Sequence, residues 1–445
     1  MSESLSDALI AKLDSREAVM GVVGLGYVGL PLCLAAAARG LAVLGFDIDE
    51  EKPRRIAAGD SYLKHIASAD LAAATGSGRF TATCDFARLS EPDILVICVP
   101  TPLSRHQEPD LSFVRNTARA IAETLRPGQL VVLESTSYPG TTDEVVRPIL
   151  EASGLACGTD FFLAFSPERE DPGNAAFTTA SIPKVVGADD AASRAAATAF
   201  YAAVVEQVVP TSSTRAAEAT KLTENIFRSV NIALMNELKT IFEPMDVDIW
   251  EVIEAAKTKP FGFMPFYPGP GLGGHCIPID PFYLSWKARE FDMRTRFIEL
   301  AGEINSSMPH RVVNRMALAM DQRLNKGLNG ARILVLGAAY KKNVDDMRES
   351  SALKIMVLLE ARGAVVDYHD PHVPGIPRTR EHPQLAGRSS VPWARGLAGQ
   401  YDACLIVTDH DCVDYAGLLE DAQLVVDTRN VCRRSGADGD NLVLA

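Results

Sequence analysis

The sequence predicts an α/β protein in which two Rossmann-like, doubly wound domains are joined by a long central helix. Apolar runs of strand length alternate with helical segments in both halves of the chain, and a glycine-rich turn follows the first run. Residues 214–243 contain neither proline nor glycine, which indicates the helix. We place the domain boundaries at 1–205, 206–324 and 325–445, a division that suits a chain of 445 residues.

The composition argues against several classes of protein. The formal charge is −13 without a lysine- or arginine-rich block, so no nucleic-acid partner is expected. Eight scattered cysteines without C-x-x-C spacing indicate reduced thiols and a cytoplasmic location, and the eight histidines show no zinc-binding pattern, so no metal is predicted. There is no signal-peptide pattern and no membrane-spanning apolar run, so no membrane partner is expected.

A dinucleotide fingerprint lies near the start of the chain. A strand-like run at 19–24 leads into G-x-G-x-x-G at 24–29, a helix at 30–39 and a second strand at 41–46 that ends in Asp47. The glycines permit a tight turn, close approach of a pyrophosphate and close helix packing. A carboxylate at Asp47 can accept from both ribose hydroxyls and would repel the 2′-phosphate of NADP. We therefore predict NAD binding by Gly24, Gly26, Tyr27, Val28, Gly29 and Asp47.

Polar side chains follow three further predicted strands, at 93–99, 130–134 and 161–165. Ligands of open parallel sheets bind beyond the carboxyl ends of the strands, so these side chains are candidate site residues. Serine and threonine also cap helices and build turns, and this structural interpretation stays open for each of them. The candidates are Thr101, Ser135, Thr136 and Glu168.

The predicted central helix carries a polar stripe. Its members recur at spacings of three and four residues and therefore share one face. A solvated charged face is the usual meaning of such a stripe, but an asparagine between two cations is less typical of one. A lysine held beside a nicotinamide can act as a general base or stabilise an oxyanion. The stripe consists of Glu218, Lys221, Asn225 and Arg228, and the apolar face of Ala219, Leu222, Ile226, Ala233 and Ile241.

A loop at 267–280 places four glycines and three prolines around a single cysteine, Cys276, with Asp280 four residues later. Glycine permits close backbone approach, and proline stiffens the remainder of the loop. An isolated cysteine is most often a small buried packing group, so the loop alone does not make Cys276 a nucleophile.

The last part of the chain predicts a second doubly wound unit that lacks the fingerprint glycines. Strands are expected at 332–337, 364–369, 401–407 and 423–427, and a helix at 351–362. Cations follow these strands and suit an anionic ligand such as a nucleotide diphosphate. They are Lys341, Arg348 and Arg429. The proline- and arginine-rich stretch 372–392 is expected to form a surface loop.

Taken together in this order, the motifs make the chain resemble the nucleotide-sugar 6-dehydrogenases, the UDP-glucose/GDP-mannose dehydrogenase family, over about residues 18–435. The motifs that carry the resemblance are Gly24-Leu-Gly-Tyr-Val-Gly29, Val99-Pro-Thr-Pro102, Glu134-Ser-Thr136, Ser166-Pro-Glu-Arg169, Glu218-Ala-Thr-Lys221-Leu-x-x-Asn225, Gly273-Gly-His-Cys276-Ile-Pro-Ile-Asp280 and Asp346-Met-Arg348-Glu-Ser350. The resemblance implies that 1–205 binds NAD, that 206–324 carries the cysteine loop and a homodimer interface, and that 325–445 binds a UDP-sugar.

The resemblance also implies a reaction. The C6 alcohol of the sugar is oxidised to an aldehyde, the thiolate of Cys276 adds to give a thiohemiacetal, and a second oxidation leaves a thioester that water hydrolyses. In this scheme Lys221 and Asp280 act as base and as partners of the water or oxyanion, and Asn225 helps to hold the oxyanion. Glu168 is the carboxylate of the hydrolysis step, and Thr136 places a water.

Further contacts follow from the same resemblance. It implies that NAD is also contacted by Lys52, Pro100, Thr101, Ser135, Thr136 and Arg348. It implies that the UDP-sugar is contacted by Glu168, Arg169, Lys221, Asn225, Arg228, Phe266, Tyr267, Gly273, Tyr340, Lys341 and Arg429.

The chain departs from the UDP-glucose pattern of the family at two places. Ile279 stands where a lysine usually precedes the aspartate of the cysteine loop, and Arg169-Glu170 replaces Phe-Leu. The stretch 259–276 is similar to the N-acetylhexosamine branch, which favours UDP-N-acetylglucosamine as substrate over UDP-N-acetylmannosamine, UDP-N-acetylgalactosamine and UDP-glucose. We hypothesise that Arg169, Arg228 and the loop Phe263–Tyr267 recognise the acetamido group.

Three other functions fit parts of the sequence. A single-step β-hydroxyacid dehydrogenase shares the fingerprint and the lysine/asparagine helix, but would yield one NADH per product. Tyr283 and Lys287 match the Y-x-x-x-K pair of epimerases and short-chain dehydrogenases, but lie far from the fingerprint, and we interpret them as a chance match. A non-catalytic NAD sensor would tolerate Cys276→Ser.

Overall fold

The computed structural model describes residues 4–63, 66–104, 108–169, 179–274 and 277–445. The chain forms two compact units. The first unit comprises Met1–Glu224 and Trp286–Met293, and the second comprises Asn225–Ser285 and Arg294–Ala445. The three domain ranges expected from the sequence stay a prediction.

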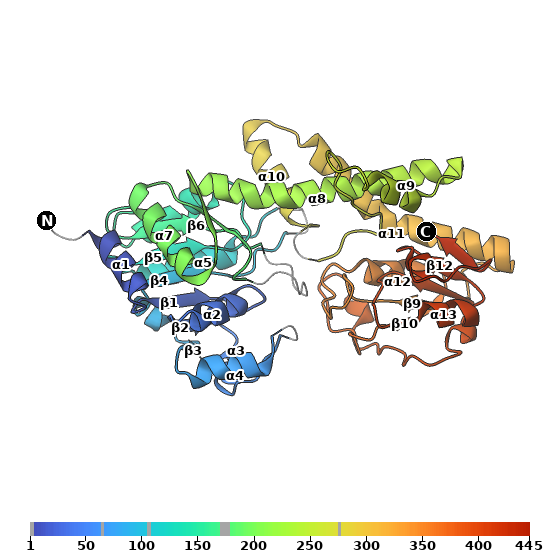
Figure 1. The fold of residues 1–445 in the computed structure, drawn as a ribbon, viewed down its shortest axis with the longest axis horizontal. Coiled ribbons are helices and arrows are strands. Elements are labelled where there is room, and N and C mark those ends of the chain that lie inside the picture. Colours follow the sequence, from blue (N-terminus) through green and yellow to red (C-terminus); the bar gives the residue numbers. More distant parts are fainter. Residues whose placement is uncertain (1–3, 64–65, 105–107, 170–178, 275–276) are drawn as a thin grey trace. The chain divides into compact units, whose positions relative to one another are not determined.

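Within the described residues, the first unit is built on an eight-stranded sheet with the order β3-β2-β1-β4-β5-β6-β7-β8 (Figure 1). The strands are β1 Val19–Val23, β2 Ala42–Phe46, β3 Phe80–Thr83, β4 Ile94–Ile97, β5 Leu130–Leu133, β6 Phe162–Phe165, β7 Lys184–Gly187 and β8 Val208–Thr211. Neighbouring strands are parallel except β6 and β7, which are antiparallel, so β7 and β8 run against the other strands. The five strands expected for this region are confirmed, whereas β3, β7 and β8 were not expected.

Alternate residues of these strands face two separate apolar layers, as a parallel sheet covered on both sides requires. One layer is completed by α1, α2, α3, α4 and α7, and the other by α5, α6 and the start of α8. These helices are α1 Leu5–Asp14, α2 Gly29–Ala38, α3 Glu51–Ala57, α4 Ser68–Gly76, α5 Ser112–Thr124, α6 Arg147–Glu151, α7 Ala191–Val204 and α8 Thr214–Phe242. A π-helical turn, η2 Thr141–Val146, precedes α6.

Helix α8 is unbroken over its 29 residues, so the long central helix is confirmed (Figure 1). The orientation expected for it is wrong in one respect. Ile241 is 42% exposed, whereas Glu218, Lys221 and Asn225 of the polar stripe are buried. Burial of polar groups requires compensating hydrogen bonds or a ligand, so the stripe is not a solvated face.

The second unit contains a parallel five-stranded sheet with the order β10-β9-β11-β12-β13 among its described residues. The strands are β9 Arg332–Leu336, β10 Val365–His369, β11 Ala403–Ile406, β12 Val425–Asp427 and β13 Leu442–Leu444. Helices α11 and α12 cover one face, and α13 and α14 the other. The helices in and around this unit are α9 Ile249–Ala256, α10 Asp280–Ala288, α11 Arg296–Leu324, α12 Ser351–Ala361, α13 Tyr415–Asp421 and α14 Val431–Arg434.

Two segments of the second unit refine the sequence expectations. Helix α11 was not expected because Pro309 lies inside it, and proline disfavours a helix interior. The stretch 372–392 is irregular, as expected, but Ile376 and Leu385 are buried in the core, so it is packed rather than a simple surface loop. No helix in the described part of the chain is long and apolar enough to cross a membrane.

Candidate active site

The glycine turn after β1 is shaped for a dinucleotide. Gly24 has a φ of 99°, and a Cβ there would lie 2.5 Å from the carbonyl oxygen of Cys98. A Cβ on Gly29 would lie 2.0 Å from the carbonyl oxygen of Gly24, so helix α2 packs directly on the turn. No described heavy atom comes within 4 Å of the Cβ position of Gly26, which leaves its backbone open to a pyrophosphate.

The carboxylate of Asp47 is held beside this turn. One oxygen accepts from the backbone N–H of Leu25 and from Nζ of Lys52, both at 2.8 Å, and the other accepts from the N–H of Asp49 at 3.0 Å. These bonds aim the carboxylate while leaving lone pairs for ribose hydroxyls. The glycine turn and Asp47 together fit NAD. NAD contacts were also predicted for Tyr27, Val28, Pro100 and Thr101, and these contacts stay predictions. Pro100 is exposed, and the other three residues are partly buried.

Ser135 and Thr136, in the segment after β5, differ in their hydrogen bonds. Ser135 donates its hydroxyl to the carbonyl of Val99 at 2.8 Å and so fastens the end of β5 to the end of β4. Thr136 is partly buried, and its hydroxyl makes no hydrogen bond with a described residue. Its hydroxyl is therefore available to a ligand or a water.

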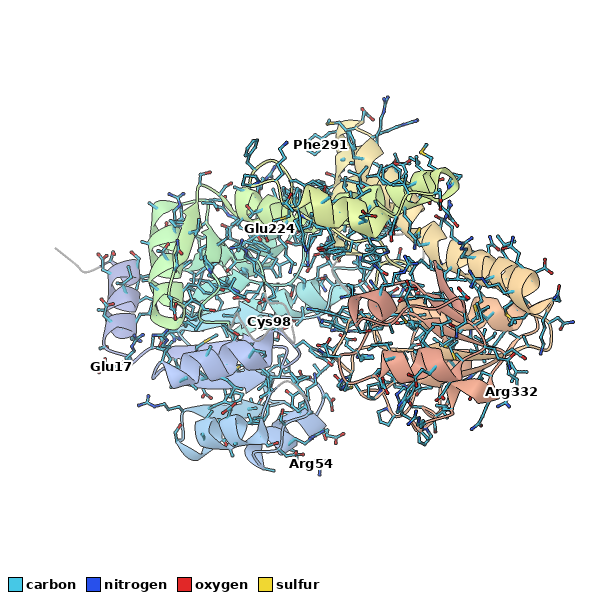
Figure 2. The ribbon with its side chains drawn as sticks, turned by 45° about the vertical axis from the view of Figure 1, so that its right-hand side comes forward. Glu17, Arg54, Cys98, Glu224, Phe291 and Arg332 are labelled. Atoms are coloured by element: carbon cyan, nitrogen blue, oxygen red, sulfur yellow. The ribbon has the colours of Figure 1, made fainter. Side chains whose placement is uncertain are left out.

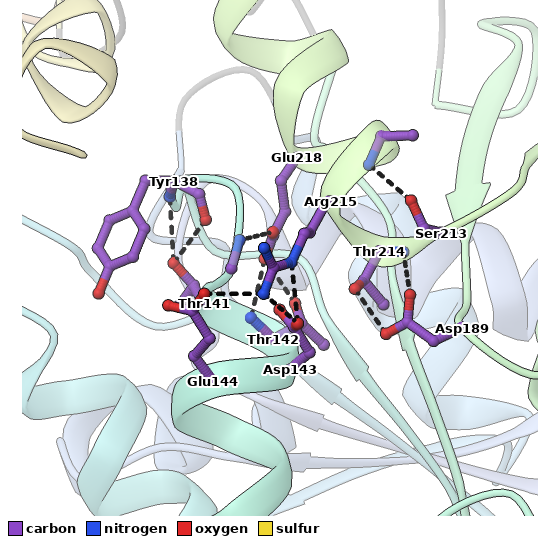
Figure 3. Close-up of polar contacts among 12 residues, drawn as sticks. Tyr138, Thr141, Thr142, Asp143, Glu144, Asp189, Ser213, Thr214, Arg215 and Glu218 are labelled. Carbon is purple, nitrogen blue, oxygen red and sulfur yellow. Dashed lines mark hydrogen bonds and ion pairs between the residues drawn. The ribbon is translucent and has the colours of Figure 1, made fainter. Parts of the chain in front are cut away.

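Glu218 anchors α8 to the loop after β5 (Figure 3). Its carboxylate accepts from the N–H of Thr142 at 2.9 Å, from the hydroxyl of Thr142 at 2.7 Å and from the N–H of Gly140 at 2.7 Å, with the hydroxyl of Ser137 at 3.4 Å. Burial raises the pKa of Glu218 to about 7, and the hydrogen bonds oppose that rise. The carboxylate thus satisfies backbone donors at the turn that leads into η2.

The first turn of α8 has further anchors in Figure 3. Arg215 donates to Asp143 at 2.7 Å and to Glu144 at 2.8 Å. The hydroxyl of Thr214 donates to Asp189 at 2.9 Å. Arg215 and Glu218 thus fix the start of the helix on the segment that follows β5, where the predicted residue Thr136 lies, and Thr214 fixes it on the turn after β7.

Lys221 follows Glu218 by three residues and is buried. In the described chain its ammonium has no ion pair and no hydrogen bond. Burial without a partner is unusual for lysine, which is almost never fully buried unless paired. A buried but uncommitted ammonium is suited to meet a group on a ligand.

Asn225 joins two other predicted residues. Its amide nitrogen donates to the carboxylate of Asp280 at 2.6 Å, and its amide oxygen accepts from Arg228. Both Asn225 and Asp280 are buried. The structure therefore brings Asn225, Asp280 and Arg228 together. Cys276 lies outside the described residues.

Glu168 follows β6 and lies in a network that the sequence analysis missed. Nζ of Lys184 lies 3.0 Å from Glu134 and 3.6 Å from Glu168, and the hydroxyl of Tyr201 donates to Glu134. Burial raises the pKa of Glu134. Burial alone would lower the pKa of Lys184, but the carboxylates of Glu134 and Glu168 outweigh it and the net pKa is raised. The missing signal was the reversed strand β7, whose first residue is Lys184.

Arg169 is bound within the first unit. Its guanidinium donates to the carboxylate of Glu224 at 2.7 Å and 3.3 Å and to the carbonyl of Pro183 at 2.7 Å. Glu224 projects from α8 (Figure 2). The predicted contact of Arg169 with the substrate stays a prediction, and Glu224 is the residue that would set its position.

In the second unit, the loop before Cys276 packs on the loop after β9. A Cβ on Gly273 would lie 2.7 Å from Cβ of Tyr340, and the N–H of Gly274 donates to the carbonyl of Arg348 at 3.0 Å. Glycine is therefore required at 273 for this close approach. The guanidinium of Arg348 binds Asp346 at 2.6 Å.

Three other predicted substrate residues of this unit lie in two regions: Phe266 and Tyr267 in the loop after α9, and Arg429 after β12. The ring of Tyr267 stacks on Trp250 at 5.6 Å and its hydroxyl donates to Glu254 at 2.9 Å, while Phe266 packs edge-on against Phe227 at 5.5 Å. Arg429 follows β12 and donates to the carbonyl of Val407 at 2.9 Å. Burial lowers the pKa of Arg429. Contacts of Phe266, Tyr267, Lys341 and Arg429 with a sugar nucleotide stay predictions.

Models of one family match the chain in three consecutive parts. The NAD-binding domain of the UDP-glucose/GDP-mannose dehydrogenase family matches residues 18–205, its central domain 215–307, and its UDP-binding domain 334–434. The chain belongs to the UDP-glucose/GDP-mannose dehydrogenase family. It is therefore an NAD-dependent UDP-sugar 6-dehydrogenase, which confirms the predicted family, NAD and the UDP-sugar class of substrate.

Relatives in this family act on different sugars. The UDP-N-acetyl-D-glucosamine 6-dehydrogenase of Pseudomonas aeruginosa is 34% identical over 89% of this chain and 91% of its own length. The NDP-N-acetyl-D-galactosaminuronic acid dehydrogenase of Ralstonia nicotianae is 34% identical over 94% of this chain and 97% of its own. The structure of UDP-D-ManNAc dehydrogenase from Pyrococcus horikoshii matches with a TM-score of 0.85 and 31% identity, covering 96% of this chain and 98% of that one.

The Y-x-x-x-K interpretation of the sequence finds no support in this fold. Tyr283 is fully buried, and Lys287 is engaged by the carboxylates of Glu144 and Glu290 at 2.8 Å and 2.7 Å. The Y-x-x-x-K match is therefore built into the packing of α10. No group of three or more histidine, cysteine, aspartate or glutamate side chains suited to a metal occurs among the described residues.

Proposed function

We propose that the protein oxidises the C6 hydroxymethyl group of a UDP-N-acetylhexosamine, with UDP-N-acetylglucosamine as the preferred substrate, to the uronic acid through a covalent adduct on Cys276. The observation that carries this proposal is the pair of buried side chains Asn225 and Asp280, joined by a 2.6 Å hydrogen bond, with Asp280 four residues beyond Cys276. Bound NAD supplies the hydride acceptor for each oxidation.

The chain's own residues divide the acid–base work. The uncommitted ammonium of Lys221 is available to hold the oxygen of the alcohol and then of the thiohemiacetal. Asp280 is held by Asn225 and can take the proton from that oxygen or from a water. Thr136 has a hydroxyl free to place a water, and Glu168 serves the hydrolysis of the thioester. NAD is held at the glycine turn and Asp47.

The preference for an acetamido sugar rests on sequence features of the loop and helix. Ile279 replaces the lysine of the UDP-glucose pattern, and Arg228 stands on α8 beside Asn225. The relatives include enzymes for N-acetylglucosamine, N-acetylgalactosamine and ManNAc at similar identity, so identity alone does not choose among these sugars. UDP-N-acetylmannosamine, UDP-N-acetylgalactosamine and UDP-glucose remain the alternatives.

A substrate panel tests the proposal. Purified enzyme is incubated with NAD and each of the four UDP-sugars, the acid is identified by mass, and NADH is counted per acid formed. We expect UDP-N-acetylglucosamine to give the highest kcat/KM, two NADH per acid, and no acid from Cys276→Ser. One NADH per product, or acid formation by Cys276→Ser, would contradict the thioester route.

We also infer a homodimer formed through the central region. Leu234 and Ile241 of α8 and Val247 before α9 are exposed large apolar side chains, which is typical of a covered surface in an assembly. Light scattering after size exclusion gives the mass that tests this. The free cysteines among the described residues are consistent with the predicted cytoplasmic location.

A further inference from the structure

The reversal between β6 and β7 places a lysine opposite the predicted hydrolysis carboxylate. Phe165 pairs with Gly187 in the antiparallel register. Continuing that register by three residues sets Glu168 opposite Lys184. The hydroxyl of Ser166 donates to the carbonyl of Val185 at 2.8 Å, which also joins the two segments. The distance of 3.6 Å between Lys184 and Glu168 agrees with this alignment.

Lys184 contacts two carboxylates that differ in exposure. Its ammonium is 7% exposed and touches Glu134, which is fully buried, and Glu168, which is 12% exposed. A buried cation needs one paired anion, and Glu134, fixed by the hydroxyl of Tyr201, already provides it. Of the two carboxylates, Glu168 is the more exposed, and it follows the carboxyl end of β6.

We propose that Lys184 is a positioning residue that orients Glu168 during hydrolysis of the acyl adduct, while Glu134 and Tyr201 hold the ammonium in place. This inference rests on the proposed function. In the step concerned, water adds to the thioester carbonyl as Glu168 takes its proton. The new C–O bond forms, the C–S bond breaks, and the electron pair returns to the sulfur of Cys276. The proton on Glu168 then passes to the thiolate, and the acid product ionises to solvent.

A purely structural role for Lys184 makes a different prediction. If the lysine only fastened β7 to β5, its loss would disturb the whole edge of the sheet and slow hydride transfer and hydrolysis together. If it positions Glu168, its loss slows hydrolysis alone. A shift of about 1 Å in a catalytic group can cost about 100-fold in rate, so we expect turnover to fall about 10- to 100-fold.

The test uses four variants of the enzyme, of which Lys184→Arg serves as the conservative rescue. Lys184→Met removes the ammonium. The double variant Glu134→Gln/Lys184→Met also removes the buried carboxylate that would otherwise lack a cation, and so avoids the folding penalty of an unpaired charge. Lys287→Met is the matched control, because Lys287 is also 7% exposed, also touches two carboxylates and belongs to the same unit.

Each variant is mixed with UDP-N-acetylglucosamine and NAD in a rapid-mixing instrument, and the protein is sampled for intact mass. We expect both Lys184 variants to release two NADH per active site at the wild-type rate, then to turn over slowly with an acyl mass adduct on the protein. Lys184→Arg should restore part of the turnover, and Lys287→Met should show no adduct.

Three results would overturn the inference. Full turnover in the double variant would show that Glu168 does not need Lys184. Parallel loss of the NADH burst and of turnover, without an adduct, would show a structural role. Both results leave two NADH per acid in the wild-type enzyme and so leave the proposed function intact. A single NADH per product in the wild-type enzyme would overturn the proposed function and this inference together.

Discussion

Replacing Glu218 by alanine removes the acceptor of four hydrogen bonds at the junction of α8 with the loop after β5. The hydroxyls of Ser137 and Thr142 can rotate to other acceptors, but the backbone N–H groups of Gly140 and Thr142 cannot. An unsatisfied buried donor costs about 1–3 kcal/mol, so two of them cost about 2–6 kcal/mol. We expect the free energy of local opening of this loop to fall by that amount.

Hydrogen exchange measures this directly, because two compact units need not unfold in one cooperative step. Peptides covering residues 137–146 are followed by mass spectrometry under native conditions in wild type and Glu218→Ala. The matched control is Glu224→Ala on the same helix. It removes a half-exposed ion pair with Arg169, which should cost only about 0–1 kcal/mol.

Two outcomes would contradict the anchoring role of Glu218. If exchange at Gly140 and Thr142 in Glu218→Ala stays within about 0.5 kcal/mol of wild type, the carboxylate does not satisfy these amides. If Glu224→Ala opens residues 137–146 equally, the effect belongs to α8 as a whole. Glu218→Gln, which keeps one acceptor oxygen, should lie between the wild type and alanine.

Four further predictions rest on contacts described above. Burial raises the pKa of Glu218 from 4.5 to about 7, so between these pH values the folded protein binds a proton that the unfolded chain releases. The free energy of unfolding should therefore fall as the pH rises from about 4.5 to 7. In denaturant titrations, Glu218→Gln should flatten this slope. Asp47→Ser should lower kcat/KM for NAD about 10- to 100-fold and leave Lys52 free to face a 2′-phosphate; an unchanged NAD/NADP ratio would contradict this assignment. Asn225→Ala should lower kcat about 100-fold with little change in KM, because Asp280 loses the hydrogen bond from the Asn225 amide; a change in KM alone would argue for substrate binding only. Arg228→Ala should narrow the preference for acetamido sugars in the UDP-sugar panel, and a retained preference counts against its predicted role.

Much of the fold could be predicted because its signals are local. The turn at Gly24 and the acid at Asp47 lie within one β-α-β segment, and strand and helix boundaries there match within one or two residues. Reversal of β7 could not be predicted, because a four-residue strand carries no mark of its direction. Helix α11 was missed because Pro309 argues locally against a helix, whereas packing in the second unit maintains it.

Only those parts of the site that have a local sequence signal could be predicted. Asn225 and Asp280 were both named as candidate catalytic residues, and their side chains are joined by a hydrogen bond. Their catalytic roles stay predictions. The pairing of Glu168 with Lys184 depends on a strand register that no single stretch of sequence displays. The anchoring role of Glu218 was missed because a glutamate in a charged stripe normally indicates solvent, and only the tertiary contacts show that it is buried.

The reversal of β7 changes which residues can reach the ligand edge of the first sheet. In a wholly parallel sheet, that edge receives only the residues that come directly after each strand, so one strand offers one short loop to the ligand. A strand of opposite direction presents its beginning there instead, and Lys184 is the first residue of β7. The edge therefore collects side chains from both ends of strands. A loop after β6 can change in length without moving Lys184, because the lysine is held by the hydrogen-bond ladder of the sheet rather than by that loop.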